Sequence, residues 1–207
     1  MGRLFWFGPR YAHGMPKAMR PRPGPKAGPK TRRPGLPPDV VSELRHMSRT
    51  GKADMAIARL ERAVVLLDRG DAPGAAAEAA KAKELAPRAP GVREILGLAL
   101  YQLERFSEAL SEMQAYRRMS GRADQNHIIA DCLRSLGRPD RAVPLAEEAL
   151  ASKGVPLAAK AEAVIVAASA LADQGKFDQA LGMLRRIRTR DDVAGPDDPA
   201  YGIYTSG

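Results

Sequence analysis

The segment Leu96-Gly97-Leu98-Ala99-Leu100-Tyr101, followed by Phe106-Ser107-Glu108-Ala109-Leu110, indicates the fold of this 207-residue chain. Both halves carry apolar residues at helical spacing, and the short stretch between them is a turn, which predicts a helical hairpin. From about Ala53 to about Arg190 the chain repeats this alternation in an Ala-, Leu-, Arg- and Glu-rich composition that favours helix. We therefore expect an all-α domain over residues 51-190, preceded by a short capping helix at 39-50.

The hairpin pattern recurs with a nearly constant period. Four alanines mark it at separations of 34, 33 and 38 residues: Ala75, Ala109, Ala142 and Ala180. A leucine stands nine residues before each alanine, a small residue twelve before, and an apolar residue four after. Five residues before stands a glycine in three of the four units, with Glu104 as the exception. Columns in register at a period of about 20 to 50 residues indicate stacked repeats, here at about 56-89, 90-122, 123-155 and 161-190.

These columns resemble the tetratricopeptide repeat family, whose unit is a helix–turn–helix with this pattern of small and large apolar positions. The best matches are the segment quoted above and Gly175-Lys176-Phe177-Asp178-Gln179-Ala180-Leu181. The resemblance covers roughly residues 56 to 190 and implies a right-handed superhelix of stacked hairpins. It also implies a non-catalytic adaptor or scaffold that binds a peptide or protein segment on its concave face.

The packing expected of such repeats follows from residue size. A small residue lets two helix axes approach closely, so Gly97 and Leu100 predict the contact between the two helices of the second unit. One hairpin alone buries too little apolar surface, whereas stacked hairpins share a continuous core. A generic Ala- and Leu-rich helical bundle is the alternative interpretation of the same composition.

In this family the concave face is lined by the first helix of each hairpin. The resemblance assigns an apolar set to this face in the first repeat: Ile57, Leu60, Val64 and Leu67. We expect the helix around residues 40–47 to pack over that set as a cap. The corresponding positions of the other three units form the expected partner-binding groove: Glu94, Leu98, Tyr101, Gln102, Asp124, His127, Asp131, Arg134, Glu162, Ile165, Ser169 and Asp173.

The groove positions hold five acids and a single cation, Arg134. This imbalance favours a basic or apolar-basic partner segment. Chaperone-binding members of the family clamp a terminal carboxylate with Lys, Arg and Asn at these positions, a role that Arg134 alone does not fill. The alternative is that the carboxylates are a solvated helix face without a ligand.

The net charge of +9 lies entirely in residues 1-38, which hold nine basic residues, no acid, nine prolines and six glycines. This composition predicts a disordered basic tail. The tail could occupy the acidic groove in cis, could be merely solubilising, or could reflect an incorrect start. A nucleic-acid-associated protein is the main alternative function, because the cations could neutralise phosphates while Phe5, Trp6, Phe7 and Tyr11 stack on unpaired bases.

Enzymatic functions find little support in the sequence. The glycines form no phosphate-binding or dinucleotide motif, and we expect no catalytic residues and no cofactor. His127 lies near Asp124 and Asp131 at helical spacing, but two carboxylates and one imidazole on a helix face are a common accident, so no metal site is expected. Cys132 is typical of a small buried thiol.

The C-terminal end of the chain carries two further expectations. Residues 191-207 are typical of an unstructured tail. The apolar positions Leu181, Leu184 and Ile187 need a cover, which indicates either a homo-oligomer or a missing repeat at the C-terminal end.

The apolar runs and the cysteine content bear on the cellular location. No apolar run approaches the roughly 18 residues of a membrane span, and a single cysteine fits a reducing compartment, so we expect a cytoplasmic protein.

Overall fold

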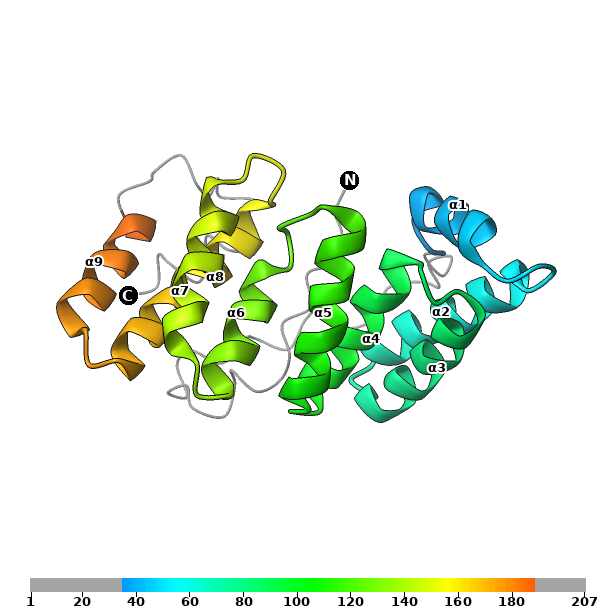
Figure 1. Cartoon of the computed structure of the whole chain (residues 1–207), viewed down its shortest axis with the longest axis horizontal. Helices are drawn as coiled ribbons and strands as arrows, with labels where there is room; N and C mark the ends of the chain where they lie inside the picture. Colours follow the sequence, from blue (N-terminus) through cyan, green and yellow to red (C-terminus); the bar gives the residue numbers. More distant parts are fainter. Residues whose placement is uncertain (1–34, 189–207) are drawn as a thin grey trace, which may run out of the picture. The chain divides into compact units, whose positions relative to one another are not determined.

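The computed structural model describes residues 35–188, and every regular element in that range is an α-helix (Figure 1). The elements are α1 (Pro38–Met47), α2 (Ala53–Asp68), α3 (Ala72–Leu85), α4 (Pro90–Gln102), α5 (Phe106–Ser120), α6 (Asn126–Ser135), α7 (Pro139–Ala151), α8 (Leu157–Asp173) and α9 (Phe177–Arg188). The predicted all-α class is confirmed. The expectations for residues 1–34 and 189–207 lie outside the described residues.

The helices from α2 onward form four consecutive pairs, and the first helix of each pair ends in the same turn. The N–H of the second residue beyond the helix cap donates to the carbonyl of the leucine column noted in the sequence, at 2.9 to 3.0 Å. This is the six-to-one hydrogen bond of the Schellman motif. The four donor–acceptor pairs are Asp71 with Leu66, Arg105 with Leu100, Arg138 with Leu133, and Lys176 with Leu171.

The residue just before each of these donors has a left-handed backbone. Its φ is 79° at Gly70, 74° at Gly137 and 72° at Gly175. In the second pair the same place is taken by Glu104, with φ 60°. The hairpin turn therefore keeps one geometry in all four pairs, including the pair in which the sequence lacks the glycine that this geometry favours.

The chain divides into two compact units, and the boundary lies within α4: the first unit ends at Ile95 and the second begins at Leu96. In the first unit, Val40 and Leu44 of α1 lie in one cluster with Leu60 of α2, and the partly buried Ile57 packs against it. Helix α1 also reaches the start of α4, where the Glu43 carboxylate accepts a hydrogen bond of 2.8 Å from the Gly91 N–H. A carboxylate at a helix N-terminus satisfies an otherwise unpaired amide, so α1 is an integral part of this unit.

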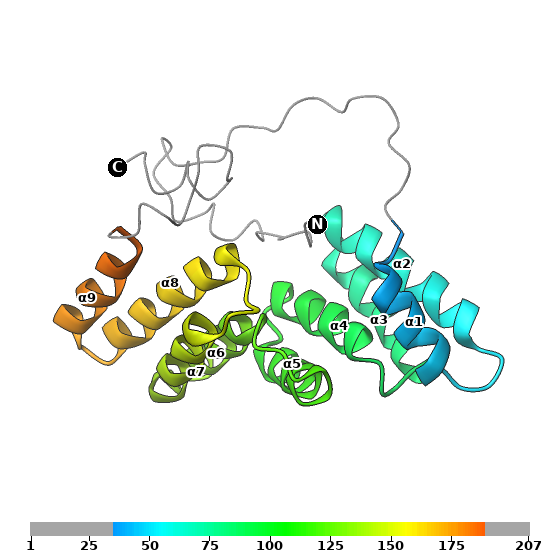
Figure 2. The same ribbon diagram turned by 90° about the horizontal axis from the view of Figure 1, so that it is seen from above.

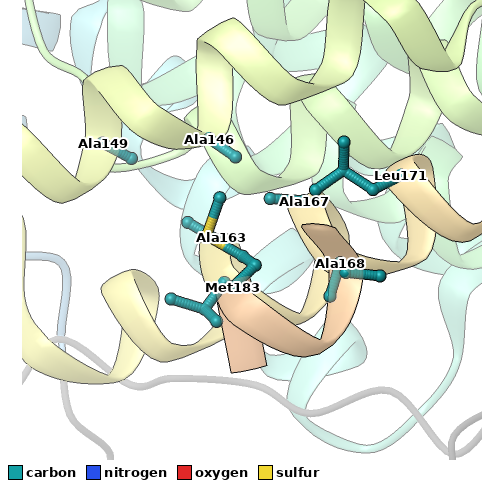
Figure 3. Close-up of a cluster of buried hydrophobic side chains, with 9 residues drawn as sticks. Ala146, Ala149, Ala163, Ala167, Ala168, Leu171 and Met183 are labelled. Atoms are coloured by element: carbon teal, nitrogen blue, oxygen red, sulfur yellow. The ribbon is translucent and has the colours of Figure 1, made fainter. Parts of the chain in front are cut away.

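In the second unit, the core is built largely from alanine. Helix α8 lies against both α6 and α7, and α9 pairs with α8 (Figure 2). The cluster in Figure 3 joins α7, α8 and α9 through these buried residues: Ala146, Ala149, Ala163, Val164, Ala167, Ala168, Leu171, Ala180 and Met183. Small side chains at helix crossings allow the close approach that such tight packing requires.

Gly97 marks the crossing of α4 and α5 in the same unit. A Cβ built on this buried glycine would lie 3.0 Å from Cγ and Cε of Met113, whose side chain is fully buried. The packing is thus tight at the position that the sequence predicts as a helix contact, and an added Cβ would require Met113 to shift by a few tenths of an ångström.

Candidate partner-binding surface

Helix α8 carries the clearest accessible stripe among the predicted groove positions. From Ala161 to Leu171 its residues are buried except at three predicted positions, Glu162, Ile165 and Ser169, which are partly exposed. Asp173 follows at the end of the helix and is exposed. The spacing of three or four residues places all four on one helix face, so α8 presents a continuous polar and apolar strip.

The predicted positions at α6 are placed differently. Asp124, His127 and Asp131 are only 5%, 9% and 6% exposed, and Arg134 is the one member of this set that remains partly accessible. Helical spacing identifies which residues share a face, but it does not say how closely a neighbouring helix covers that face. Three of the four positions therefore contribute contacts inside the protein rather than an open surface.

Four of the predicted residues form one chain of hydrogen bonds across α4, α6 and α8. The Tyr101 hydroxyl donates to Oδ2 of Asp131 at 2.5 Å, and Arg134 Nε donates to Oδ1 of the same carboxylate at 2.9 Å. Arg134 Nη1 then donates to Asp173 Oδ2 at 3.1 Å. The one cation of the predicted groove is thus held between two of its acids.

Asp124 is also engaged within the protein. The Tyr116 hydroxyl donates to Asp124 Oδ1 at 2.9 Å, and an Nη2 nitrogen of Arg122 lies 2.8 Å from Oδ2. Neither Tyr116 nor Arg122 is among the predicted site residues. Repeat columns could not reveal them, because they come from α5 and the following loop rather than from the first helix of a pair.

Glu162 is the acid whose charge is most open to change. Burial raises the pKa of its carboxyl to about 7, and the nearby negative charge of Asp131 raises it further. In the described part of the chain, no ion-pair partner of Glu162 is found. A cation arriving beside Glu162 and Asp131 would therefore favour the ionised form of this carboxyl.

His127 is held neutral in the folded protein. Burial lowers the pKa of its imidazole to about 4, against the opposing effect of Asp124 and Asp131. Within the described residues its Nδ1 is buried and has no hydrogen-bond partner. The imidazole therefore adds no positive charge to this region near neutral pH.

The accessible strip consists of Arg134, Glu162, Ile165, Ser169 and Asp173, and we call it the α6–α8 surface. Tyr101 joins it to the second-unit end of α4, which also carries the partly exposed Leu98 and Gln102. Glu94, the remaining predicted position, lies in the part of α4 that belongs to the first unit. Because Asp124 and Asp131 are buried, the α6–α8 surface exposes fewer acids than the five that the sequence places in the groove.

The state of Cys132 and the placement of possible metal ligands bear on chemistry in the described residues. Burial raises the pKa of the Cys132 thiol to about 12, so the reactive thiolate is disfavoured. No group of three or more His, Cys, Asp or Glu side chains in residues 35–188 is arranged to hold a metal ion. In the same range, no helix combines the length and the apolar character that crossing a membrane requires.

Comparisons with known proteins agree on the repeat type. Two tetratricopeptide repeat family models match the chain, at residues 50–81 and 128–198. The solved structure of MamA MSR-1 aligns with a TM-score of 0.58 at 17% identity, over 73% of this chain and 85% of that chain. MamA AMB-1 aligns with a TM-score of 0.56 at 18% identity, over 76% and 84%. No curated protein sequence matches. The resemblance to the tetratricopeptide repeat family is confirmed, and the MamA structures share its helical-repeat fold.

Proposed function

We propose that this tetratricopeptide repeat chain is a non-catalytic interaction scaffold that binds a basic or apolar-basic segment of another protein on the α6–α8 surface. The observation that carries the proposal is the accessible strip of α8, in which Glu162, Ile165 and Ser169 are separated by buried residues. A strip of this kind can receive an extended or helical segment along its length.

The charge of the surface supports a basic ligand, though only one or two cations. Arg134 balances one of the two aspartates that it contacts, which leaves one negative charge on the Asp131–Arg134–Asp173 group. Glu162 adds a second when it is ionised. A lysine or arginine of the partner placed near Glu162 would lower the pKa of that carboxyl and gain a charged hydrogen bond.

The apolar part of the recognition comes from Ile165 on α8 and Leu98 on α4, both partly exposed. Isolated charge pairs at a surface contribute little affinity, so burial of an apolar side chain of the partner is needed as well. We therefore expect ligands in which a basic residue lies within a turn or two of an aliphatic or aromatic residue.

A peptide-selection experiment tests the proposal and needs no identified partner. The full chain is immobilised, random short peptides are selected on it, and affinities are measured by fluorescence anisotropy. We expect enrichment of Lys or Arg beside an apolar residue, with binding weakened by Glu162→Gln and by Ser169→Arg. Glu147→Gln, an exposed acid on α7, is the matched control and should leave the affinity unchanged.

The same chain also distinguishes the nucleic-acid alternative. A labelled single-stranded oligonucleotide should bind no more tightly to the parent than to a variant whose cations in residues 1–34 are replaced by Gln. Tight, salt-sensitive oligonucleotide binding that is lost in that variant, together with no peptide enrichment, would overturn the proposed function.

A further inference from the structure

Within the first unit, a helix already lies on two of the positions that the family resemblance assigns to the concave face. Helix α1 packs beside α2 (Figure 2), where Val40 and Leu44 share a core cluster with Leu60. Ile57 packs against the same cluster. Val40 and Leu44 stand four residues apart and therefore on one helix face. Leu44 and Leu60 are both fully buried, so a helix of 10 residues is long enough to cover this part of α2.

The same columns of the repeat recur on α8. When the alanine columns of the first and fourth repeats are aligned, Glu162 takes the place of Ile57. Ile165 likewise takes the place of Leu60. The helices α2 and α8 have 16 and 17 residues, and both end in a Schellman turn with a six-to-one hydrogen bond of 2.9 Å. Ile165 remains partly exposed, so within the described residues no helix covers it as α1 covers Leu60.

The character of α8 favours a helical occupant over an extended one. An extended peptide gains affinity by pairing its backbone with a sheet edge, and a polyproline segment docks in an aromatic-lined groove. Every regular element in residues 35–188 is a helix, whose interior backbone groups bond within the helix. The strip of Glu162, Ile165 and Ser169 also has no aromatic member. A helical partner satisfies its own backbone, so it needs only side-chain contacts with α8.

The exchange of isoleucine for Glu162 sets the chemistry of the helix that fits. In the part of the chain that the structure describes, Glu162 has no ion-pair partner. The negative charge of Asp131 adds to the effect of burial and raises the pKa of the Glu162 carboxyl, and a cation beside it would relieve this repulsion. Ile165 keeps the apolar character of its counterpart on α2. The fitting helix therefore needs one basic and one apolar residue on the same face, at the four-residue spacing seen in α1.

We propose that the partner segment on the α6–α8 surface is an amphipathic helix that lies on α8 as α1 lies on α2. It places a lysine or arginine beside Glu162 and, four positions away on the same face, an aliphatic residue against Ile165. This inference rests on the proposed function, because it specifies the form of the ligand that binds there. It adds that helical spacing, and not proximity in an extended segment, brings the two ligand residues together.

Designed peptides test the helical form on the unaltered full chain. Each has about 16 residues of Ala- and Gln-rich sequence, long enough to form a helix, with a fluorescent label and a lactam bridge away from the contact face. The contact peptide carries Lys and Leu four residues apart. The spacing control carries them two apart, on different faces, and the helix-breaking control lacks the bridge and has a central proline. By fluorescence anisotropy, we expect the contact peptide to bind at least about tenfold more tightly than either control, because each control loses one of the two contacts.

A change of preference tests the position of the basic residue. Glu162→Ile gives α8 the residue that α2 has in this column, so the helix that fits best carries Leu in place of Lys. We expect the ratio of affinities for the Lys–Leu and Leu–Leu peptides to fall at least about tenfold in this variant. Glu147→Ile, at an exposed acid on α7, is the matched control and should leave the ratio unchanged. Because both peptides are measured on one preparation, the ratio does not depend on the folded fraction of the variant.

The outcomes separate this inference from the proposed function. Equal binding of the contact peptide and both controls, weakened in each case by Glu162→Gln, would keep the surface as a binding site but overturn the helical occupant. The same conclusion follows if selected peptides bind the surface and none of the designed helices does. An unchanged ratio in Glu162→Ile would overturn the placement of the basic residue. Binding of no peptide, designed or selected, would overturn both the proposed function and this inference.

Discussion

The Tyr101 hydroxyl and the Asp131 carboxylate, from α4 and α6, lie 2.5 Å apart in a hydrogen bond. The same carboxylate binds Arg134, which reaches on to Asp173 of α8. Asp131, which the sequence suggested as a ligand contact, thus connects consecutive repeats through hydrogen bonds inside the protein. Because the carboxylate is nearly buried, its partners matter more for stability than those of an exposed acid would.

Tyr101→Phe tests the hydrogen bond between Tyr101 and Asp131. The ring contact with Phe106, edge-to-face at 5.9 Å between centroids, is retained, while the hydroxyl that donates to Asp131 is lost. We expect the free energy of unfolding to fall by about 1–3 kcal/mol, because a buried charged acceptor loses a donor. Urea unfolding followed by circular dichroism measures the change, and a loss below about 0.3 kcal/mol would contradict the role assigned to this bond.

Glu104→Gly should stabilise the protein. Glu104 has φ 60° where the other three turns have glycine, and a left-handed backbone costs an ordinary residue about 1–2 kcal/mol. Since glycine also loses more chain entropy on folding, we expect a net gain of about 0.5–1 kcal/mol. Thermal unfolding measures it. Glu104→Ala is the control, because it removes the side chain but keeps the strain, and an equal gain in that variant would refute the backbone explanation.

Gly97→Ala should have the opposite effect. Its new Cβ would lie 3.0 Å from Met113, whose side chain is fully buried and would have to shift. We expect destabilisation by about 1–3 kcal/mol from overpacking. Gly182→Ala on the exposed face of α9 is the matched control: among the described residues, no atom beyond its chain neighbours and its own helix backbone lies within 4 Å of its Cβ position, so higher helix propensity should raise stability by up to about 1 kcal/mol. Equal effects at both sites would contradict the close crossing of α4 and α5.

Glu162→Gln should change how stability depends on pH. The pKa of Glu162 is raised to about 7 in the folded state from its ordinary value of 4.5, so between these values the native state binds more protons than the unfolded state. This group's contribution to stability is therefore full below about pH 4.5 and is lost as pH rises through about 7. Relative to the parent, the Gln variant should be more stable at pH 8 than at pH 5.

His127 contributes in the opposite direction. Its pKa is lowered to about 4 from its ordinary value of 6.5, so its contribution is lost as pH falls from about 6.5 toward 4. Because His127 is present in both proteins, that effect cancels in the difference between parent and Glu162→Gln. Denaturant unfolding at several pH values gives this difference, and a pH-independent value would show that burial does not perturb Glu162.

The fold could be predicted from the sequence because the same local residue pattern recurs in each repeat, and its recurrence strengthens a pattern that is weak in any one repeat. The column of leucines from Leu66 to Leu171 proved to be the acceptor of each hairpin turn, and Gly97 proved to be a helix crossing. Even the one missing glycine, at Glu104, was compensated, since the other turn contacts hold the backbone in the same left-handed state. The geometry of a helical hairpin depends mainly on residues that are close in sequence, so it can be predicted from one sequence.

The candidate site was less accessible, because it depends on contacts between repeats. Groove positions carried over from the family did identify the open strip of α8, but they also included Asp124 and Asp131, which are buried and bound by other side chains. The Asp131–Arg134 pair, three residues apart on one helix, could have been found from spacing alone. The bonds from Tyr101 and to Asp173 could not, because they require the relative placement of three helices.

Hydrogen–deuterium exchange of the full chain, with and without the tightest selected basic peptide, is the decisive test of binding at the α6–α8 surface. If the peptide binds there, amide exchange should slow in α6 and α8 and remain unchanged in α3 and in residues 1–34. Slowing confined to residues 1–34, or the same slowing of α6 and α8 in a variant carrying Glu162→Gln and Ser169→Arg, would contradict binding at this surface.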